Sequence, residues 1–211
     1  MSLETVRMSP IFLSPGDRLV VVFGGGPVAL RKCRHFEGFR LRVVAPDVMD
    51  ELRDLADEVV SEAVDPGSAG RYMDGADIVV AATSSHGLND SIRDIAMSKG
   101  IMTNSAHGGG DVLIPSTLRR DGFTVTVSSE GRVPAFPPYV ISKIDGFLDP
   151  SYDSMLRLLV RLRAYIRDRI PTQPGRAEFL AGVLADDGIW ALLEDGDEDA
   201  AFEAAIGRMS G

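Results

Sequence analysis

The stretch that decides the fold reads VVVFGGGPVALRK and occupies residues 20–32. An apolar run ends at Phe23, three glycines follow, and the next residues can open a helix. Gly24, Gly26 and Ala29 fit the pattern G-x-G-x-x-G/A. In such a turn the first glycine permits a tight strand-to-helix bend, and the second lets a pyrophosphate approach the backbone at the helix N-terminus. The stretch predicts a nucleotide-binding βαβ unit, against the alternative of a plain glycine-rich turn.

The first half of the chain alternates between strand and helix patterns. Strands that alternate with helices at this spacing indicate a parallel sheet with helices on both faces. We therefore expect an α/β fold with a Rossmann-like sheet. The expected strands are 19–23, 41–45, 58–63, 76–82 and 101–104, and the expected helices are 28–36, 48–56 and 88–98.

The pattern changes after Gly110. Residues 123–128 alternate between apolar and hydroxyl side chains, which is typical of a half-buried strand. Helices are expected at 139–147, 150–170, 176–184 and 189–193, followed by an acidic stretch with no helix assigned to it. We divide the chain into an NAD-binding domain (8–111), a small α+β dimerisation and active-site segment (112–148) and a C-terminal helical region (149–211). An apolar face in the middle segment needs a partner, so we expect a homodimer.

Composition restricts the classes of function. The net charge of −9 disfavours a nucleic-acid partner, because phosphate binding needs a basic surface. No apolar run reaches a membrane-spanning length and no signal peptide is evident, so we expect a cytoplasmic protein without a membrane partner. The single cysteine, Cys33, allows no internal disulfide and no zinc cluster, and we expect no bound metal. Residues 1–7 resemble a leader, with Met8 as an alternative start.

The segment that would bind adenosine departs from the usual pattern. A ribose-binding acid normally stands at the tip of the second strand, about 20 residues after the glycines. Here Ala45, Pro46 and Asp47 follow that strand. Asp47 is either a displaced ribose ligand or a polar loop residue. Because no Arg or Lys follows before Arg53, a 2′-phosphate would lack a partner, and we expect NAD rather than NADP.

Six segments of the chain form a recognisable pattern, namely Pro10–Leu13, Gly24–Lys32, Val43–Asp47, Ala81–Thr83, Leu88–Asn89 and Val127–Gly131. Together they resemble the siroheme synthase N-terminal family, whose members are precorrin-2 dehydrogenases and in some cases also sirohydrochlorin ferrochelatases. The helical tail is similar to the C-terminal helical region of that family. The resemblance implies an NAD-dependent homodimer that oxidises precorrin-2, a carboxylate-rich tetrapyrrole, to sirohydrochlorin.

The resemblance also implies where the site residues lie. The residues expected to hold NAD are Gly24, Gly25, Gly26, Pro27, Val28, Pro46, Asp47, Ala82 and Thr83. The residues expected to bind substrate are Asn104, Ser128, Arg119, Arg120, Arg132 and Lys143. The four cations would offset the substrate's carboxylates, although each is alternatively a surface charge. Ser129 and Asp111 are catalytic candidates, and Asp111 is alternatively a structural acid.

His107 marks a departure from the family pattern. Members usually carry Asn-Val-Val-Asp here, and that Asp is implicated in both activities, whereas this chain reads Asn104-Ser105-Ala106-His107. An imidazole can accept a proton near neutral pH, so His107 is a candidate general base, the alternative being a loop histidine without a role. The missing Asp lowers the prospect of ferrochelatase activity. A non-catalytic NAD(H)-sensing module is the alternative to an enzyme.

Overall fold

The computed structural model describes residues 8–210, so the expectation about residues 1–7 lies outside the described part of the chain. The chain divides into two compact units. Unit 1 comprises the chain up to Ile114 together with Glu130–Arg132, and unit 2 comprises Pro115–Ser129 and the chain from Val133 onward. Among the described residues, no helix combines the length and the apolar character needed to cross a membrane.

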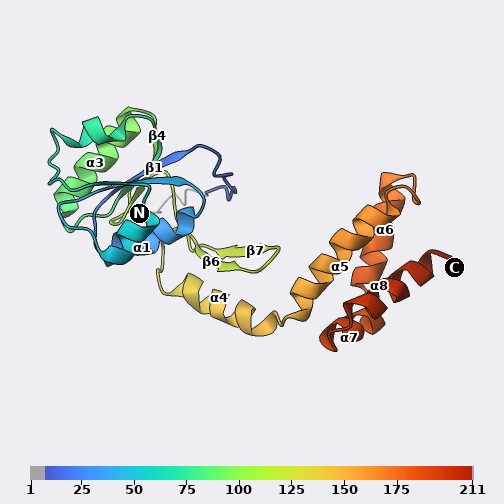
Figure 1. Ribbon diagram of the computed structural model, residues 1–211. Helices are drawn as coiled ribbons and strands as arrows, with labels where there is room; N and C mark the ends of the chain where they lie inside the picture. The colour runs from blue at the N-terminus through green and yellow to red at the C-terminus, as the bar shows by residue number, and fades with distance from the viewer. Residues whose placement is uncertain (1–7, 211) are drawn as a thin grey trace, which may run out of the picture. The chain divides into compact units, whose positions relative to one another are not determined.

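Unit 1 is built on a five-stranded parallel sheet in the order β3-β2-β1-β4-β5. Strands β1 and β4, which are labelled in Figure 1, are neighbours in this sheet. Its strands are β1 (Leu19–Phe23), β2 (Arg40–Val44), β3 (Glu58–Val60), β4 (Ala76–Ala81) and β5 (Met102–Ser105). The strand order reverses between β1 and β4. This is the switch point at which open α/β sheets bind ligands, outside the carboxyl ends of the strands.

Helical segments pack against the sheet through two separate hydrophobic clusters. The segments are α1 (Pro27–Cys33), η1 (Arg34–Phe36), α2 (Asp50–Leu55), η2 (Ala69–Met73) and α3 (His86–Ser98). Val20 and Val22 of β1 belong to the cluster that contains α1, whereas Val21 and Phe23 belong to the cluster that contains α3. Because successive strand residues point to opposite faces, the central strand is buried on both sides. The expected Rossmann-like α/β fold is confirmed.

Several element boundaries in unit 1 differ from those expected from the sequence. The first helix becomes a 3₁₀ turn at Arg34, and the third strand ends at Val60 rather than at residue 63. Helix α3 begins two residues earlier than expected. The Ser85 side chain accepts a hydrogen bond from the backbone N–H of Leu88 and caps the helix there.

Unit 2 begins with an antiparallel hairpin of β6 (Ser116–Arg119) and β7 (Thr124–Val127), against which α4 (Phe136–Phe147) packs. The prolines at 137 and 138 lie inside α4, because the first turn of a helix does not need their missing N–H groups. The chain continues through α5 (Ser151–Ile166), α6 (Gln173–Leu184), α7 (Asp187–Glu194), α8 (Glu198–Gly207) and η3 (Arg208–Ser210). Helices α6, α7 and α8 each pack on α5.

The acidic stretch to which no helix was assigned contains the start of α8, which corrects the sequence expectation. Asp197 accepts a hydrogen bond from the Ala200 N–H as the N-cap. Carboxylates in the first helical turn are stabilised by the helix dipole. Glu198 and Asp199 also pair with arginines of α5, at 2.6 Å from Arg157 and 2.6 Å from Arg161 respectively.

Candidate active site

The glycine turn after β1 contains two glycines that the fold itself requires. Gly24 has a φ of +124°, and a Cβ there would lie 2.3 Å from the Ala82 carbonyl oxygen. A Cβ on Gly25 would lie 1.9 Å from the Asp47 carbonyl oxygen. Both positions bring two stretches of backbone closer than any side chain allows.

Gly26 is different, because nothing in the protein excludes a side chain there. Its φ of −96° and ψ of −170° are ordinary for any residue. A Cβ at this position would meet no heavy atom within 4 Å. The space beside Gly26 therefore remains open to a ligand that approaches the backbone, as the second glycine of a dinucleotide turn does.

Backbone hydrogen bonds join this turn to the tips of the neighbouring strands. Gly24 N–H donates to the Val44 carbonyl, Met49 N–H donates to the Gly25 carbonyl, and Ala82 N–H donates to the Phe23 carbonyl. The loop carrying exposed Pro46 and Asp47 thus adjoins the glycines on one side, and the residues after β4 adjoin them on the other. The structure brings together at the carboxyl edge of the sheet the residues expected to hold NAD, which are Gly24–Val28, Pro46, Asp47, Ala82 and Thr83.

A buried amide organises the loop that follows β4. Asn89 of α3 is fully buried, and its Oδ1 accepts hydrogen bonds from the Thr83 backbone N–H (2.9 Å) and the Thr83 hydroxyl (2.8 Å). Its Nδ2 donates to the Thr83 carbonyl at 3.0 Å. Asn89 thereby fixes Thr83, an expected cofactor residue.

His107 lies two residues beyond the end of β5, exposed at the same carboxyl edge. Its Nδ1 is 3.0 Å from Asn89 Nδ2. Its ring stacks on that of His86, with ring centroids 3.3 Å apart and an interplanar angle of 27°. Sequence reasoning missed both His86 and Asn89 as site residues. Their position just after a central strand of an open sheet was the available signal.

Asn104 of β5 was expected to bind substrate, but its buried amide is engaged within unit 1 at both ends. Nδ2 donates to the Val112 carbonyl at 2.8 Å, and Oδ1 accepts from Lys32 Nζ of α1. Burial, with a smaller contribution from Arg31, lowers the pKa of Lys32. Lys32 belongs to the Arg-Lys pair after the glycines and was not expected as a site residue. A substrate group could reach the Asn104 amide only by displacing these partners.

Asp111, a catalytic candidate, forms a hydrogen bond with the backbone at the edge of β5. Its Oδ1 accepts a hydrogen bond from the Thr103 N–H at 2.6 Å, and the next residue, Val112, donates its N–H to the Thr103 carbonyl at 3.0 Å. The carboxylate thereby closes a sheet edge that would otherwise leave a backbone donor unpaired. This contact favours the structural alternative for Asp111.

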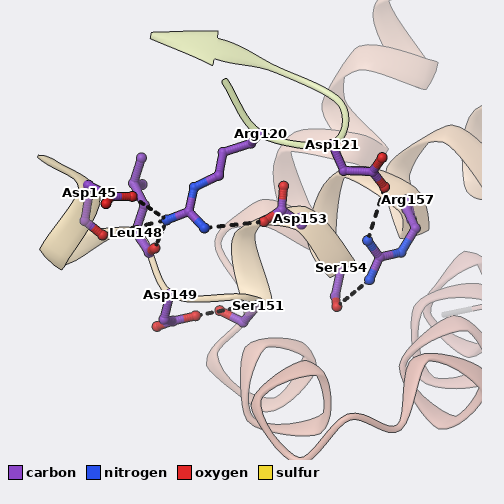
Figure 2. Close-up of polar contacts among 9 residues, drawn as sticks. All are labelled: Arg120, Asp121, Asp145, Leu148, Asp149, Ser151, Asp153, Ser154 and Arg157. Atoms are coloured by element: carbon purple, nitrogen blue, oxygen red, sulfur yellow. Dashed lines mark hydrogen bonds and ion pairs between the residues drawn. The ribbon is translucent and has the colours of Figure 1, made fainter. Parts of the chain in front are cut away.

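The Arg120 guanidinium, which was expected to bind substrate, contacts the junction between α4 and α5 (Figure 2). It binds the Asp145 carboxylate (3.1 Å) and the Leu148 carbonyl, and lies 3.8 Å from the Asp153 carboxylate. A second ion pair, Arg157 with Asp121 at 3.6 Å, joins the same hairpin turn to α5. These contacts favour a structural role in unit 2, and substrate binding by Arg120 stays a prediction.

The remaining candidates lie in or beside the turn that follows β7 and on α4 and β6. The Ser129 hydroxyl donates to the Val133 carbonyl (3.1 Å) and accepts from the Val133 N–H (3.2 Å), closing that turn. Arg132 lies 3.4 Å from the Glu130 carboxylate, and Lys143 lies over the Tyr139 ring at 5.6 Å. Arg119 ends β6 and Ser128 directly follows β7. The roles of Ser128, Ser129, Arg119, Arg132 and Lys143 stay predictions.

Comparisons with known proteins place this chain in a family. Residues 11–116 match a family model described as NAD(P)-binding. The precorrin-2 dehydrogenase of Methanosarcina barkeri is 32% identical over 209 residues, which cover 95% of this chain and 93% of that protein. The siroheme synthase of Pseudomonas aeruginosa PAO1 is 32% identical over 174 residues, and the match covers 81% of this chain but 37% of that longer protein.

A solved structure shows the same fold. The structure titled "SirC, precorrin-2 dehydrogenase" aligns with a TM-score of 0.77 at 22% identity, covering 95% of this chain and 100% of that chain. The structural likeness shows the fold, and the family assignment rests on the sequence matches. It belongs to the NAD(P)-binding family that includes the precorrin-2 dehydrogenases and the siroheme synthases.

Proposed function

We propose that this protein is an NAD-dependent precorrin-2 dehydrogenase. The reaction removes one hydride and one proton from precorrin-2, leaving sirohydrochlorin, NADH and a released proton. The near-full-length match to a precorrin-2 dehydrogenase supports the substrate. The main support for a bound dinucleotide is Gly26, which lies at the switch point of the sheet. Neither its φ nor any neighbouring protein atom requires a glycine there, whereas a nearby pyrophosphate would.

The residues at the carboxyl edge fit a dinucleotide. The open space at Gly26 admits a pyrophosphate, while Thr83, fixed by Asn89, lies after the adjacent strand. The nicotinamide, when bound, accepts the hydride, and the protein supplies binding and orientation. NAD is preferred over NADP in this proposal, because exposed Asp47 adjoins the glycine turn and no cation occurs among residues 46–52. A carboxylate there opposes a 2′-phosphate.

A carboxylate-rich substrate needs a local cationic lining on a protein whose net charge is −9. Arg119, Arg132 and Lys143 are the proposed contributors, whereas Arg120 is committed to the α4–α5 junction. Ser128, Ser129 and His107 are further residues proposed to contact the substrate.

A homodimer is part of the proposal. In unit 2, α4 leaves three aromatic side chains exposed, namely Phe136 (55%), Tyr139 (60%) and Phe147 (71%). An exposed apolar patch of this kind marks a protein interface. A cytoplasmic location is also proposed, since NAD⁺ is a metabolite of that compartment.

The test is to incubate the purified protein with precorrin-2 and NAD⁺ and to follow both the sirohydrochlorin spectrum and NADH absorbance. Equal formation of the two products supports the dehydrogenase. NAD⁺ binding by calorimetry without precorrin-2 oxidation would instead identify an NAD(H)-sensing module. Adding Fe²⁺ to the product mixture tests for ferrochelatase activity, since the sirohydrochlorin spectrum would then give way to that of its iron complex.

A further inference from the structure

The hydrogen bonds of Asn89 determine which end of its amide faces His107. The backbone N–H of Thr83 can only donate, so the Asn89 atom 2.9 Å from it must be the acceptor Oδ1. The other end of the amide is therefore the donor Nδ2, which also suits its 3.0 Å contact with the Thr83 carbonyl. Asn89 Nδ2 lies 3.0 Å from His107 Nδ1. Because an amide nitrogen cannot accept a hydrogen bond, the second N–H of Nδ2 donates to His107 Nδ1.

A histidine whose Nδ1 accepts a hydrogen bond carries its proton on Nε2 in the neutral ring. The opposite tautomer would set two N–H donors against each other. If the His107 ring were rotated by half a turn, a ring carbon would face the Asn89 amide in place of Nδ1. One N–H of the fully buried Asn89 would then have no acceptor, which costs free energy. The stack against His86 holds the ring plane, and Nε2 lies on the side of the ring away from Asn89.

We propose that Asn89 is a positioning residue that holds His107 as an Nε2–H donor toward a carboxylate of the substrate. Carboxylates only accept hydrogen bonds, so they match the donor that exposed His107 presents. As a proton acceptor, His107 would have to take the proton on Nδ1 and break its bond with Asn89, since Nε2 is already protonated. The donor role thus replaces the general-base role that the sequence suggested. The identity of the ligand rests on the proposed function, whereas the tautomer does not.

Nitrogen NMR of the unliganded protein tests the tautomer directly. In a long-range ¹H–¹⁵N correlation spectrum, Nε2 couples to both ring protons and Nδ1 mainly to Hε1, and protonated and unprotonated nitrogens differ widely in shift. The chain has three histidines, so His35→Gln and His86→Gln variants assign the signals. We expect His107 to be protonated at Nε2. Asn89→Asp places a carboxylate acceptor against Nδ1 and should move the proton there, whereas the control Ser91→Ala on the same helix should not.

Kinetics with precorrin-2 and NAD⁺ test the role. Gln carries an amide N–H about as far along the side chain as Nε2, so His107→Gln should retain most of the precorrin-2 affinity that His107→Ala loses. His107→Ala should raise KM for precorrin-2 by about tenfold or more, because a hydrogen bond to a charged group is lost, while kcat changes less. Affinity for NAD⁺ should be unchanged in both variants.

Two results overturn the proposal. One is a His107 ring protonated at Nδ1 in the unaltered protein. The other is an equal collapse of kcat in His107→Gln and His107→Ala with KM preserved, which is the behaviour of a general base. If the unaltered protein fails to oxidise precorrin-2, the proposed function fails, and the NMR result still decides the tautomer.

Discussion

Replacing Gly26 with valine should abolish tight NAD binding without unfolding the protein. In the free protein a Cβ at this position meets nothing within 4 Å, and φ is −96°, so the fold tolerates the side chain. Reducing the freedom of the unfolded chain stabilises the fold by about 0.4–1 kcal/mol, and losing a glycine N-cap costs a similar amount. The free energy of unfolding should therefore change by less than about 1 kcal/mol.

NAD should bind Gly26→Val at least about tenfold more weakly, which is about 1.4 kcal/mol, because the branched side chain fills the space that the pyrophosphate needs. Titration calorimetry with NAD⁺ measures the affinity, and thermal denaturation followed by circular dichroism measures the stability. A folded Gly26→Val protein with unaltered affinity for NAD⁺ would refute the assignment of this turn.

The neighbouring glycine supplies a matched control. A Cβ on Gly25 would lie 1.9 Å from the Asp47 carbonyl oxygen, so Gly25→Ala forces two backbone segments apart. We expect it to lower the free energy of unfolding by about 1–3 kcal/mol, as overpacking does. If Gly25→Ala were as stable as the unaltered protein, the packing of the strand tips would differ from that described, and the contrast with Gly26 would lose its basis.

Four further expectations can be measured directly. NAD⁺ should give a higher kcat/KM than NADP⁺ in the precorrin-2 assay, because Asp47 opposes a 2′-phosphate; equal values would contradict this. Light scattering at micromolar concentration should give a dimer mass, and Tyr139→Glu should shift it toward the monomer; a monomeric unaltered protein would exclude the exposed face of α4 as the interface. Arg120→Ala should lower the free energy of unfolding by about 1–3 kcal/mol, because it leaves Asp145, Leu148 and partly buried Asp153 without their partner, and NAD⁺ affinity should stay unaltered. Asp197→Ala should cost about 1 kcal/mol through loss of the α8 N-cap, visible as a lower melting temperature; no change would deny the cap.

The sheet was predictable because β1 and residues 78–81 of β4 are buried on both faces and therefore appear as apolar runs. The site was only partly predictable. The sequence offers three consecutive glycines but does not say which two the fold requires, since that depends on the Ala82 and Asp47 carbonyls facing them. Likewise Arg120 and Arg132 look equally suited to bind an anion. Only the structure shows that each already has acidic neighbours, Asp145 and Asp153 for Arg120 and Glu130 for Arg132.

The resemblance to the siroheme synthase N-terminal family implies an Asp where this chain has His107, and the contact with Asn89 can be compared for the two residues. Asn89 presents an N–H donor to this position, and both a carboxylate oxygen and an unprotonated Nδ1 can accept it. What differs is the outward side. If His107 donates its Nε2–H to the substrate as proposed, it replaces an outward carboxylate, which would repel a carboxylate-rich substrate, with a hydrogen-bond donor. The proton lost in the oxidation would then pass to solvent instead of to this side chain. In this proposal the Asn89 amide, which lies on α3 eighteen residues before His107, determines which nitrogen of the His107 ring carries the proton.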